Sequence, residues 1–413
     1  MTEARQETGP GPAEPGRAAG GGRPWVMLVM ATLGFAVNFW AWALLSPLAP
    51  GLKDALRLTS FEQSLLVAVP VLVGSLGRIP VGALTDRFGG RVMFPAVSLI
   101  TIVPVLYLGL AGHSSLPALL AGGFFLGIGG TAFAIGVPFV NAWFPPERRG
   151  LAIGIFGAGM GGTAVSALTT VKEADRWGTE TPFVVMAVLL AVYAAASWFV
   201  LREAPGRTAP AEPLAARLAA TARLGVTWQM SALYAVAFGG YVAFSVYLPT
   251  YLKAEYGLST ADAANRMAGF VLLAVVMRPV GGWLSDRLGA VRVMTVSLAV
   301  TVAGAVVQSF APALMPVGTI AFLAMAAALG AGSGATFALV AQLAPANKVG
   351  AVTGVVGAAG GLGGFVPPLL MGALWGSLGE YRIGLLLLSL VAAAAGVFTA
   401  TSVRRAVATR RAT

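Results

Sequence analysis

The sequence has no cysteine and one histidine among its 413 residues. Without cysteine the chain has no disulfide and no thiolate metal ligand, and a lone histidine, His113, cannot build a metal centre. Charged residues are also scarce, since Asp, Glu, Lys and Arg together make up 10% of the chain. We therefore predict no metal and no cofactor, and an enzyme that depends on histidine or thiol chemistry is disfavoured.

What the sequence has in abundance is apolar residues. They make up 57% of the chain, and the mean hydropathy of +0.81 is far above that expected of a soluble domain. Apolar runs of about 20 residues, long enough to cross a bilayer, recur throughout. Twelve transmembrane helices are predicted, at residues 25–50, 62–85, 92–112, 116–143, 150–171, 181–201, 227–252, 263–284, 290–311, 315–343, 349–377 and 382–402.

The apolar runs divide the chain into two sets of six. Residues 25–202 hold the first six predicted helices and residues 227–403 hold the others. Residues 203–226 form a predicted cytoplasmic linker, whose Pro-rich start precedes a stretch expected to form a short surface helix. Residues 1–24 are polar and rich in Gly and Pro, which predicts a disordered tail rather than a signal peptide, and residues 404–413 form a basic tail.

Basic residues outnumber acidic ones, which gives a net charge of +11 and a pI near 10.5. Such a charge can indicate nucleic-acid binding, but here the basic residues gather at one face of the predicted membrane domain. With both termini on one side, eighteen Lys and Arg residues lie on that side and seven lie opposite. The positive-inside rule then places both termini in the cytoplasm. The two remaining basic residues, Arg78 and Arg278, fall in no loop.

A repeat with an offset of 200 residues relates the two sets of helices, and its strongest part matches residues 71–91 with residues 271–292. The aligned pairs include Arg78 with Arg278, Asp86 with Asp286, Arg87 with Arg287, Gly157 with Gly357, and Gly161 with Gly361. The predicted fold class is therefore an all-α polytopic membrane protein of two parallel six-helix halves, with a site between them near the middle of the membrane.

The two arginines are placed where a charge is costly. Arg78 precedes Asp86 by eight residues, so it lies about 12 Å inside the cytoplasmic boundary, at a depth where an arginine costs about 2.5 to 3.5 kcal/mol. All sixteen acidic residues fall in predicted loops, tails or helix ends, so none is placed to neutralise Arg78 or Arg278. Two fixed positive charges in one cavity repel each other, and a bound anion would relieve the repulsion. The planar guanidinium suits a planar oxyanion.

Glycine-rich segments occur in the fifth and eleventh predicted helices. GAGMGG at 157–162 formally matches the G-x-G-x-x-G dinucleotide fingerprint, but that motif needs a preceding strand and a βαβ unit. Within a membrane helix, glycines spaced three or four residues apart favour close helix packing instead. We therefore predict that these two helices slide against their neighbours.

GALTDRFGGR at 82–91 and GWLSDRLGAVR at 282–292 resemble the signature loops of the major facilitator superfamily. In each loop the Asp can cap a helix or pair with Arg, so the loops are predicted to stabilise one conformation. The segments around Arg78 and Arg278, together with GIFGAGMGG and GVVGAAGGLGGFVPP, resemble the nitrate/nitrite porter family within that superfamily. This resemblance covers roughly residues 28–400.

The resemblance implies a set of site residues. In that family an arginine on helix 2 and one on helix 8 clamp the anion, and they map onto Arg78 and Arg278. An asparagine on helix 5 contacts substrate in some members, but Gly161 stands at the corresponding position here, so the preference between nitrate and nitrite and the mode of coupling stay open. The aromatic residues that sandwich the flat anion map onto Phe39, Phe133, Tyr234 and Phe238.

The function that this resemblance implies is nitrate and nitrite transport across the inner membrane by alternating access, in a monomer that binds neither nucleic acid nor cofactor. Nitrate/nitrite exchange is favoured, because no buried acid is available to carry a proton. Three alternatives stay open: proton-coupled nitrate symport, a carrier for another small anion such as cyanate, formate or an organic acid, and a membrane sensor. A membrane-embedded enzyme is disfavoured, since no catalytic constellation is present.

Overall fold

The computed structural model describes residues 23–205, 214–345 and 348–412, and within them the chain is almost entirely helical. The first half contains α1 (Arg23–Trp42), α2 (Leu45–Leu56), α3 (Ser60–Leu76), α4 (Arg78–Phe88), α5 (Gly90–Leu110), α6 (Leu116–Leu126), η1 (Gly127–Thr131), α7 (Ala132–Trp143), α8 (Pro146–Gly157), η2 (Ala158–Gly161), α9 (Gly162–Trp177) and α10 (Thr181–Val200). The rest contains α11 (Leu214–Ala222), α12 (Gly225–Tyr256), α13 (Thr260–Leu288), α14 (Ala290–Ser309), η3 (Leu314–Gly318), α15 (Thr319–Leu343), α16 (Val349–Gly363), α17 (Val366–Leu378), α18 (Arg382–Phe398), η5 (Thr399–Val403) and α19 (Arg404–Ala412).

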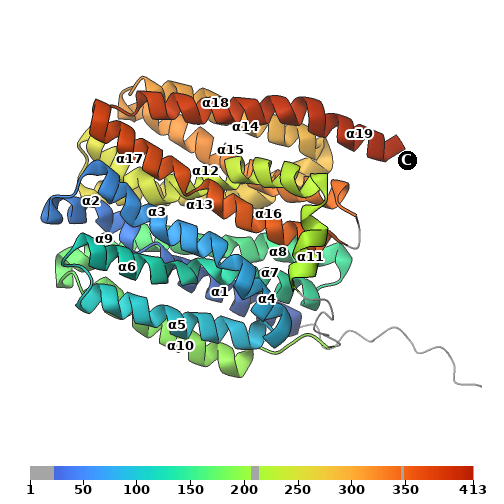
Figure 1. Cartoon of the computed structure of the whole chain (residues 1–413), viewed down its shortest axis with the longest axis horizontal. Helices are drawn as coiled ribbons and strands as arrows, with labels where there is room; N and C mark the ends of the chain where they lie inside the picture. Colours follow the sequence, from blue (N-terminus) through green and yellow to red (C-terminus); the bar gives the residue numbers. More distant parts are fainter. Residues whose placement is uncertain (1–22, 206–213, 346–347, 413) are drawn as a thin grey trace, which may run out of the picture.

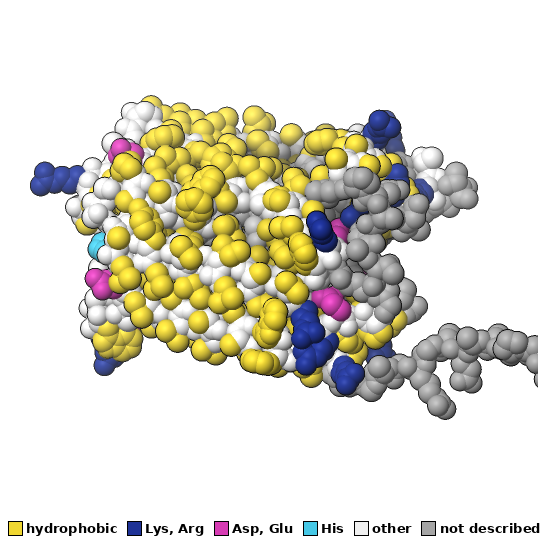
Figure 2. Space-filling model, turned by 60° about the horizontal axis from the view of Figure 1, so that its bottom comes forward, with side chains coloured by type: hydrophobic (Ala, Val, Ile, Leu, Met, Phe, Trp, Pro, Cys, Tyr) yellow, Lys and Arg dark blue, Asp and Glu magenta, His cyan; other side chains and the backbone are white. Residues whose placement is uncertain are grey.

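Within the described residues, twelve helical stretches are long and apolar enough to cross a membrane, each overlapping one of the twelve predicted helices. Helices suit these runs because lipid offers no hydrogen bonds, so each backbone amide must be satisfied within its own segment. The surface agrees with this placement, since a broad apolar band covers the middle of the molecule and charged side chains lie at its two ends (Figure 2). The chain is an integral membrane protein, as predicted.

The two halves of the chain lie side by side as two helix bundles (Figure 1). Helices α1 to α10 form one bundle, and α12 to α18 form the other. The bundles meet along several helix pairs, among them α9 with α13, α3 with α17, and α2 with α12. A side chain that projects into this interface from the start of α4 or from α13 is therefore enclosed by both halves.

Three of the membrane helices of the first half are interrupted near their centres. Two short 3₁₀ segments, η1 and η2, break the fourth and fifth spans, and the second span changes from α3 to α4 at Gly77. Such breaks leave backbone carbonyls outside the regular α-helical pattern, which the membrane interior tolerates only where protein or a cavity surrounds them. The breaks lie close to the arginines.

Glycines let the arginine-bearing helices approach their neighbours closely. A Cβ on Gly334 of α15 would collide with the backbone carbonyl of Arg278, and one on Gly330 would collide with that of Ala274. In the first half, a Cβ on Gly130 of η1 would lie 3.1 Å from the Cα of Gly74. This small-residue packing brings backbones into contact, and it fixes the position of each arginine along the interface.

Polar contacts between described residues join the halves at the end opposite the Asp-Arg loops. Ser46 donates to the carbonyl of Val246 (2.6 Å), and Gln63 donates to Thr250 (3.0 Å). Lys253 forms an ion pair with Asp54 at 2.7 Å. The first two contacts are buried, so they contribute more than the exposed ion pair. The interface is thus held closed at this end.

The segments outside the bundles are only partly described. Residues 1–22 of the predicted disordered tail lie outside the described residues, whereas residues 23–24 begin α1. The predicted linker contains the short helix α11, and the predicted basic tail continues as α19. Arg410 of α19 donates to the carbonyls of Leu343 and Ala344, which caps the C-terminus of α15.

Candidate functional site

Arg78 begins α4, directly after the break at Gly77. A Cβ on Gly77 would lie 2.8 Å from Thr131 Cγ2, so glycine allows the second span to pack tightly at this point. The Arg78 side chain is only 7% exposed, and its Nε donates to the carbonyl of Gly130 at 3.4 Å. Its Nη1 donates to the carbonyl of Gly357 at 2.6 Å. Gly357 lies on α16, in the other half of the protein.

Arg278 occupies the equivalent position in the second half, on the continuous helix α13. It too is 7% exposed. Its Nη2 donates to the hydroxyl of Tyr234 at 2.8 Å, and its Nη1 lies directly against the sulfur of Met160, which is its acceptor. Met160 belongs to η2 of the first half. Each arginine therefore reaches across the interface and finds an acceptor in the opposite bundle.

The two guanidinium groups have no acidic partner among the described side chains. Arg78 and Arg278 are the only charged side chains that are buried among the side chains that the structure describes. The acceptors they contact are two backbone carbonyls, a phenol and a thioether, and all of these are neutral. A buried charge without an opposite charge is strongly unfavourable, so the arrangement favours an anion between them.

Aromatic rings surround the same two groups. The Cζ of Arg78 lies 5.3 Å from the ring centroid of Phe133 and 5.8 Å from that of Phe238. The Cζ of Arg278 lies 5.8 Å and 5.4 Å from the same two rings, and 5.9 Å from Tyr234. Both arginines therefore share the faces of Phe133 and Phe238, and cation–π attraction partly offsets their burial.

Of the four aromatic residues mapped from the family, the structure brings three to the arginines. Phe39 lies apart from this group, in a cluster with Phe35 (centroids 4.4 Å apart) and Trp42 (5.0 Å). It is 1% exposed, so the surrounding helices of the first half enclose it. Phe39 thus supports the wall of the site rather than contacting a guanidinium group.

Phe337 is an aromatic neighbour of the site that sequence reasoning missed. Its ring lies 5.5 Å from the Cζ of Arg278 and packs edge-on to Tyr234 at 4.8 Å. The repeat offered a signal for it, because Phe133 aligns with Ser333 and Phe337 lies one helical turn beyond Ser333. The second half therefore supplies its aromatic wall from the tenth span, one turn further along than the first half does.

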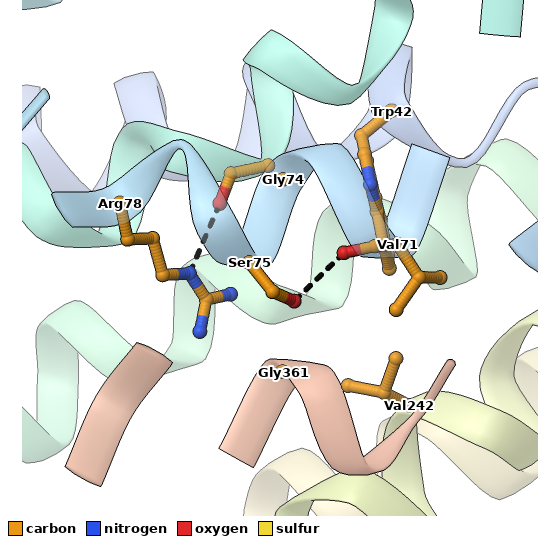
Figure 3. A pocket seen from close by; sticks show the side chains of 8 residues that line it. Trp42, Val71, Gly74, Ser75, Arg78, Val242 and Gly361 are labelled. Carbon is orange, nitrogen blue, oxygen red and sulfur yellow. Dashed lines mark hydrogen bonds between the residues drawn. The ribbon is translucent and has the colours of Figure 1, made fainter. Parts of the chain in front are cut away.

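A small cavity adjoins Arg78. Its volume of about 10 Å³ is room for roughly one water molecule. Figure 3 shows the Arg78 guanidinium beside Ser75, facing Gly361 on the helix of the other half. Trp42 and Val242 line the same space. A polyatomic anion would fit here only if the halves moved apart slightly, as alternating access requires.

The paired glycines lie on the two helices that face these arginines. A Cβ on Gly157 would lie 3.8 Å from Arg278 Cδ, and one on Gly357 would lie 3.2 Å from a carbon of Phe133. A Cβ on Gly361 would lie 3.2 Å from Arg78 Nη1 and would collide with Ser75 Oγ, whereas a Cβ on Gly161 would meet nothing within 4 Å. Gly357 and Gly361 therefore make room for side chains of the first half.

The Asp-Arg loops lie far from the aromatic group, at the ends of α4 and α13. Asp86 forms an ion pair with Arg217 of α11 at 2.7 Å, which ties the linker helix to the first half. Arg87 and Arg287 lie over the neighbouring rings of Phe88 and Trp283, at 5.2 Å and 4.2 Å. Asp286 lies next to Arg287, at the equivalent point of the second half.

The arrangement as a whole suits the binding of a small planar oxyanion. Two guanidinium groups offer N–H donors in a fork that matches planar oxyanions. The flat rings between them offer stacking surfaces and few competing polar groups. Since each half supplies one arginine, an anion that bound both would draw the halves together.

Comparison with known proteins places the chain in a family. A profile of the Major Facilitator Superfamily matches residues 31–366 and 230–412. The chain is 50% identical to the "Probable nitrate/nitrite transporter NarK2" of Mycobacterium tuberculosis, over 92% of this chain and 97% of that protein. It is 37% identical to the "Nitrite extrusion protein" of Bacillus subtilis, over 91% of this chain and 93% of that protein.

The fold agrees with this relationship. A bacterial homologue of the human lysosomal transporter Spinster, solved in an inward-facing and occupied conformation, matches with a TM-score of 0.71 at 20% identity, covering 94% of this chain and 97% of that one. The prediction of a transporter rather than an enzyme is confirmed by these relatives. The chain therefore belongs to the major facilitator superfamily and, within it, to the nitrate/nitrite porter family.

Proposed function

We propose that this protein moves nitrate and nitrite across the inner membrane by exchanging one for the other. The observation that carries the proposal is the pair Arg78 and Arg278, buried from opposite halves beside the same rings and without an acidic partner among the described side chains. The names of the relatives, a nitrate/nitrite transporter and a nitrite extrusion protein, point to the same anions.

The anion binds between the two arginines, with Phe133 and Phe238 against its flat faces and Tyr234 at its edge. Nitrate and nitrite are planar and carry a single negative charge spread over their oxygens, so each can accept N–H bonds from both guanidinium groups at once. Carriers for larger organic acids would need more room and more polar partners than this ring-lined site offers. Substrate contact by these five residues is supported by the placement of the three rings against the two guanidinium groups.

Exchange follows from the cost of bringing the two arginines together without an anion. Two unit charges about 4 Å apart repel by about 4 kcal/mol at an effective dielectric constant of about 20, and doubling the separation halves this energy. The bound anion removes this repulsion, so the loaded carrier changes conformation faster than the unloaded one. The carrier then needs a second anion from the other side before it can return to its first conformation. Nitrate or nitrite can be that anion in either direction.

The exchange proposal predicts trans-stimulation in proteoliposomes. External nitrite should accelerate efflux of labelled nitrate by about tenfold or more, since about 1.4 kcal/mol of barrier corresponds to a factor of ten. A pH gradient alone should drive little uptake. Uptake driven by the pH gradient, with no response to external nitrite, would establish proton-coupled symport instead.

A carrier for another small anion is the second candidate, and a competition assay separates the two. Nitrate and nitrite should raise the melting temperature of the purified protein, because a ligand that binds only the folded state stabilises it. Formate and cyanate should have no effect at the same concentration. A larger shift with formate or cyanate would reassign the substrate.

The proposed orientation has both termini in the cytoplasm, and it follows from the distribution of Lys and Arg along the chain. The Asp-Arg loops, the linker helix α11 and α19 then all lie on the cytoplasmic side. The ion pair between Lys253 and Asp54 lies on the periplasmic side. In this orientation the structure is closed towards the periplasm.

A further inference from the structure

Met160 is an unusual partner for a buried arginine. Its sulfur lies directly against Arg278 Nη1, and the residue is only 2% exposed. A thioether is a weak acceptor, whereas a buried charge is normally satisfied by strong ones. Met160 belongs to the half opposite to Arg278, and the 3₁₀ segment η2 that carries it packs against α13.

The first arginine is held differently. Arg78 Nη1 donates to the carbonyl of Gly357, a strong acceptor, at 2.6 Å. By the repeat, the counterpart of Gly357 is Gly157, yet the first half offers Arg278 the sulfur of Met160. The two cross-interface contacts therefore differ in strength, although the two halves are built alike.

This difference has a consequence for anion binding. An anion that takes an N–H from a strong acceptor leaves that acceptor buried and unpaired, which is costly. A thioether that loses its contact with an N–H costs little free energy in an apolar site, because sulfur is soft and weakly polar. The Arg278 N–H that faces Met160 is thus one that an anion can take at low cost, whereas the Arg78 N–H that faces Gly357 is not.

We propose that Met160 is a positioning residue that holds Arg278 across the interface by a displaceable contact, which the anion takes over when it binds. This inference rests on the proposed function, since it takes nitrate as the group that replaces the sulfur. Met160 keeps the guanidinium aimed at the interface when no anion is there and competes only weakly when one arrives.

The proposal predicts an effect of definite sign for Met160→Leu, which keeps the volume of the side chain but removes the acceptor. Nitrate should bind about fivefold more tightly, because it no longer competes with sulfur for Arg278. The apparent KM for nitrate in proteoliposomes should fall by a similar factor. A side chain that merely packed against its neighbours would give weaker binding or no change.

The test is calorimetric titration of nitrate into the purified protein and into Met160→Leu. The matched control is Met186→Leu, since Met186 is 0% exposed on α10 in a separate apolar cluster and should leave the affinity unchanged. If Met160→Leu does not give a monodisperse protein, Met160→Ala also lacks the acceptor and should tighten binding as well.

The outcomes separate the two proposals. Absence of nitrate binding to the unmodified protein would overturn the proposed function itself. Nitrate binding to the unmodified protein, with equal or weaker binding to Met160→Leu, or to Met160→Ala where that variant replaces it, would overturn the role of Met160 alone. Tighter binding to Met160→Leu with unchanged binding to Met186→Leu is the expected result.

Discussion

Replacing Arg278 by lysine is expected to reduce nitrate exchange by at least about 30-fold, and Arg78→Lys should do the same. Lysine keeps the charge but loses the planar fork that can hold two oxygens of one anion. Loss of a buried, hydrogen-bonded charged contact costs about 2 to 5 kcal/mol, and the lower end corresponds to a factor of about 30. Initial rates of labelled nitrate uptake into nitrite-loaded proteoliposomes would measure the effect.

The control for this substitution is Arg266→Lys on the same helix. Arg266 lies near the start of α13, where it pairs with Asp262 and is partly exposed, so its replacement should leave exchange within about twofold of the unmodified rate. Comparable melting temperatures would show that the Arg278→Lys protein is folded. Full exchange activity in a folded Arg278→Lys protein would be incompatible with an arginine clamp.

A single methyl group at Gly361 is expected to lower exchange by at least about tenfold. The added Cβ would collide with Ser75 Oγ and lie 3.2 Å from Arg78 Nη1, both in the opposite half. Overpacking of this kind costs about 1 to 3 kcal/mol. Because Gly361 and its obstacles belong to different halves, the cost falls on closing the interface rather than on folding either bundle. Gly361→Ala should therefore lower the transport rate while leaving the melting temperature nearly unchanged.

The repeat supplies a matched control for Gly361→Ala. Gly161 is its counterpart at the offset of 200 residues, and a Cβ there would meet nothing within 4 Å. Gly161→Ala should keep most of the exchange activity. Equal losses in the two variants would mean that these helices need glycine for some reason other than the space opposite Arg78.

The fold could be predicted because the physical constraint is simple. Each apolar run must be helical in lipid, so length and hydropathy sufficed to place all twelve spans. The breaks in the helices were not predictable in the same way. Gly77 and the segments η1 and η2 lie inside uninterrupted apolar runs, and their geometry depends on neighbours that a single sequence does not identify.

The candidate site was predictable where charge was involved and less so elsewhere. Arg78 and Arg278 stood out because a buried charge needs a partner, and the placement of every acidic residue could be read directly. Apolar side chains carry no such constraint. Phe337 and Met160 were therefore not among the predicted site residues, while Phe39 was mapped to the site from the family and lies in a neighbouring aromatic cluster.

The glycine-rich helices illustrate the same limit. Their spacing predicted close packing and sliding, but it gave no reason to treat Gly161 and Gly361 differently. The structure separates them, since only Gly361 faces a side chain of the opposite half at close range. That difference comes from Ser75 and Arg78, which are distant in sequence.

Equilibrium binding of nitrate to the protein with both arginines replaced tests the shared anion site most directly. Calorimetric titration would compare the unmodified protein, Arg78→Lys, Arg278→Lys and the double variant. If one anion bridges both guanidinium groups, each single variant loses most of the binding and the double variant loses little more, because the two contacts act as a unit. Nitrate binding to a folded double variant with the affinity of the unmodified protein would contradict a site between Arg78 and Arg278.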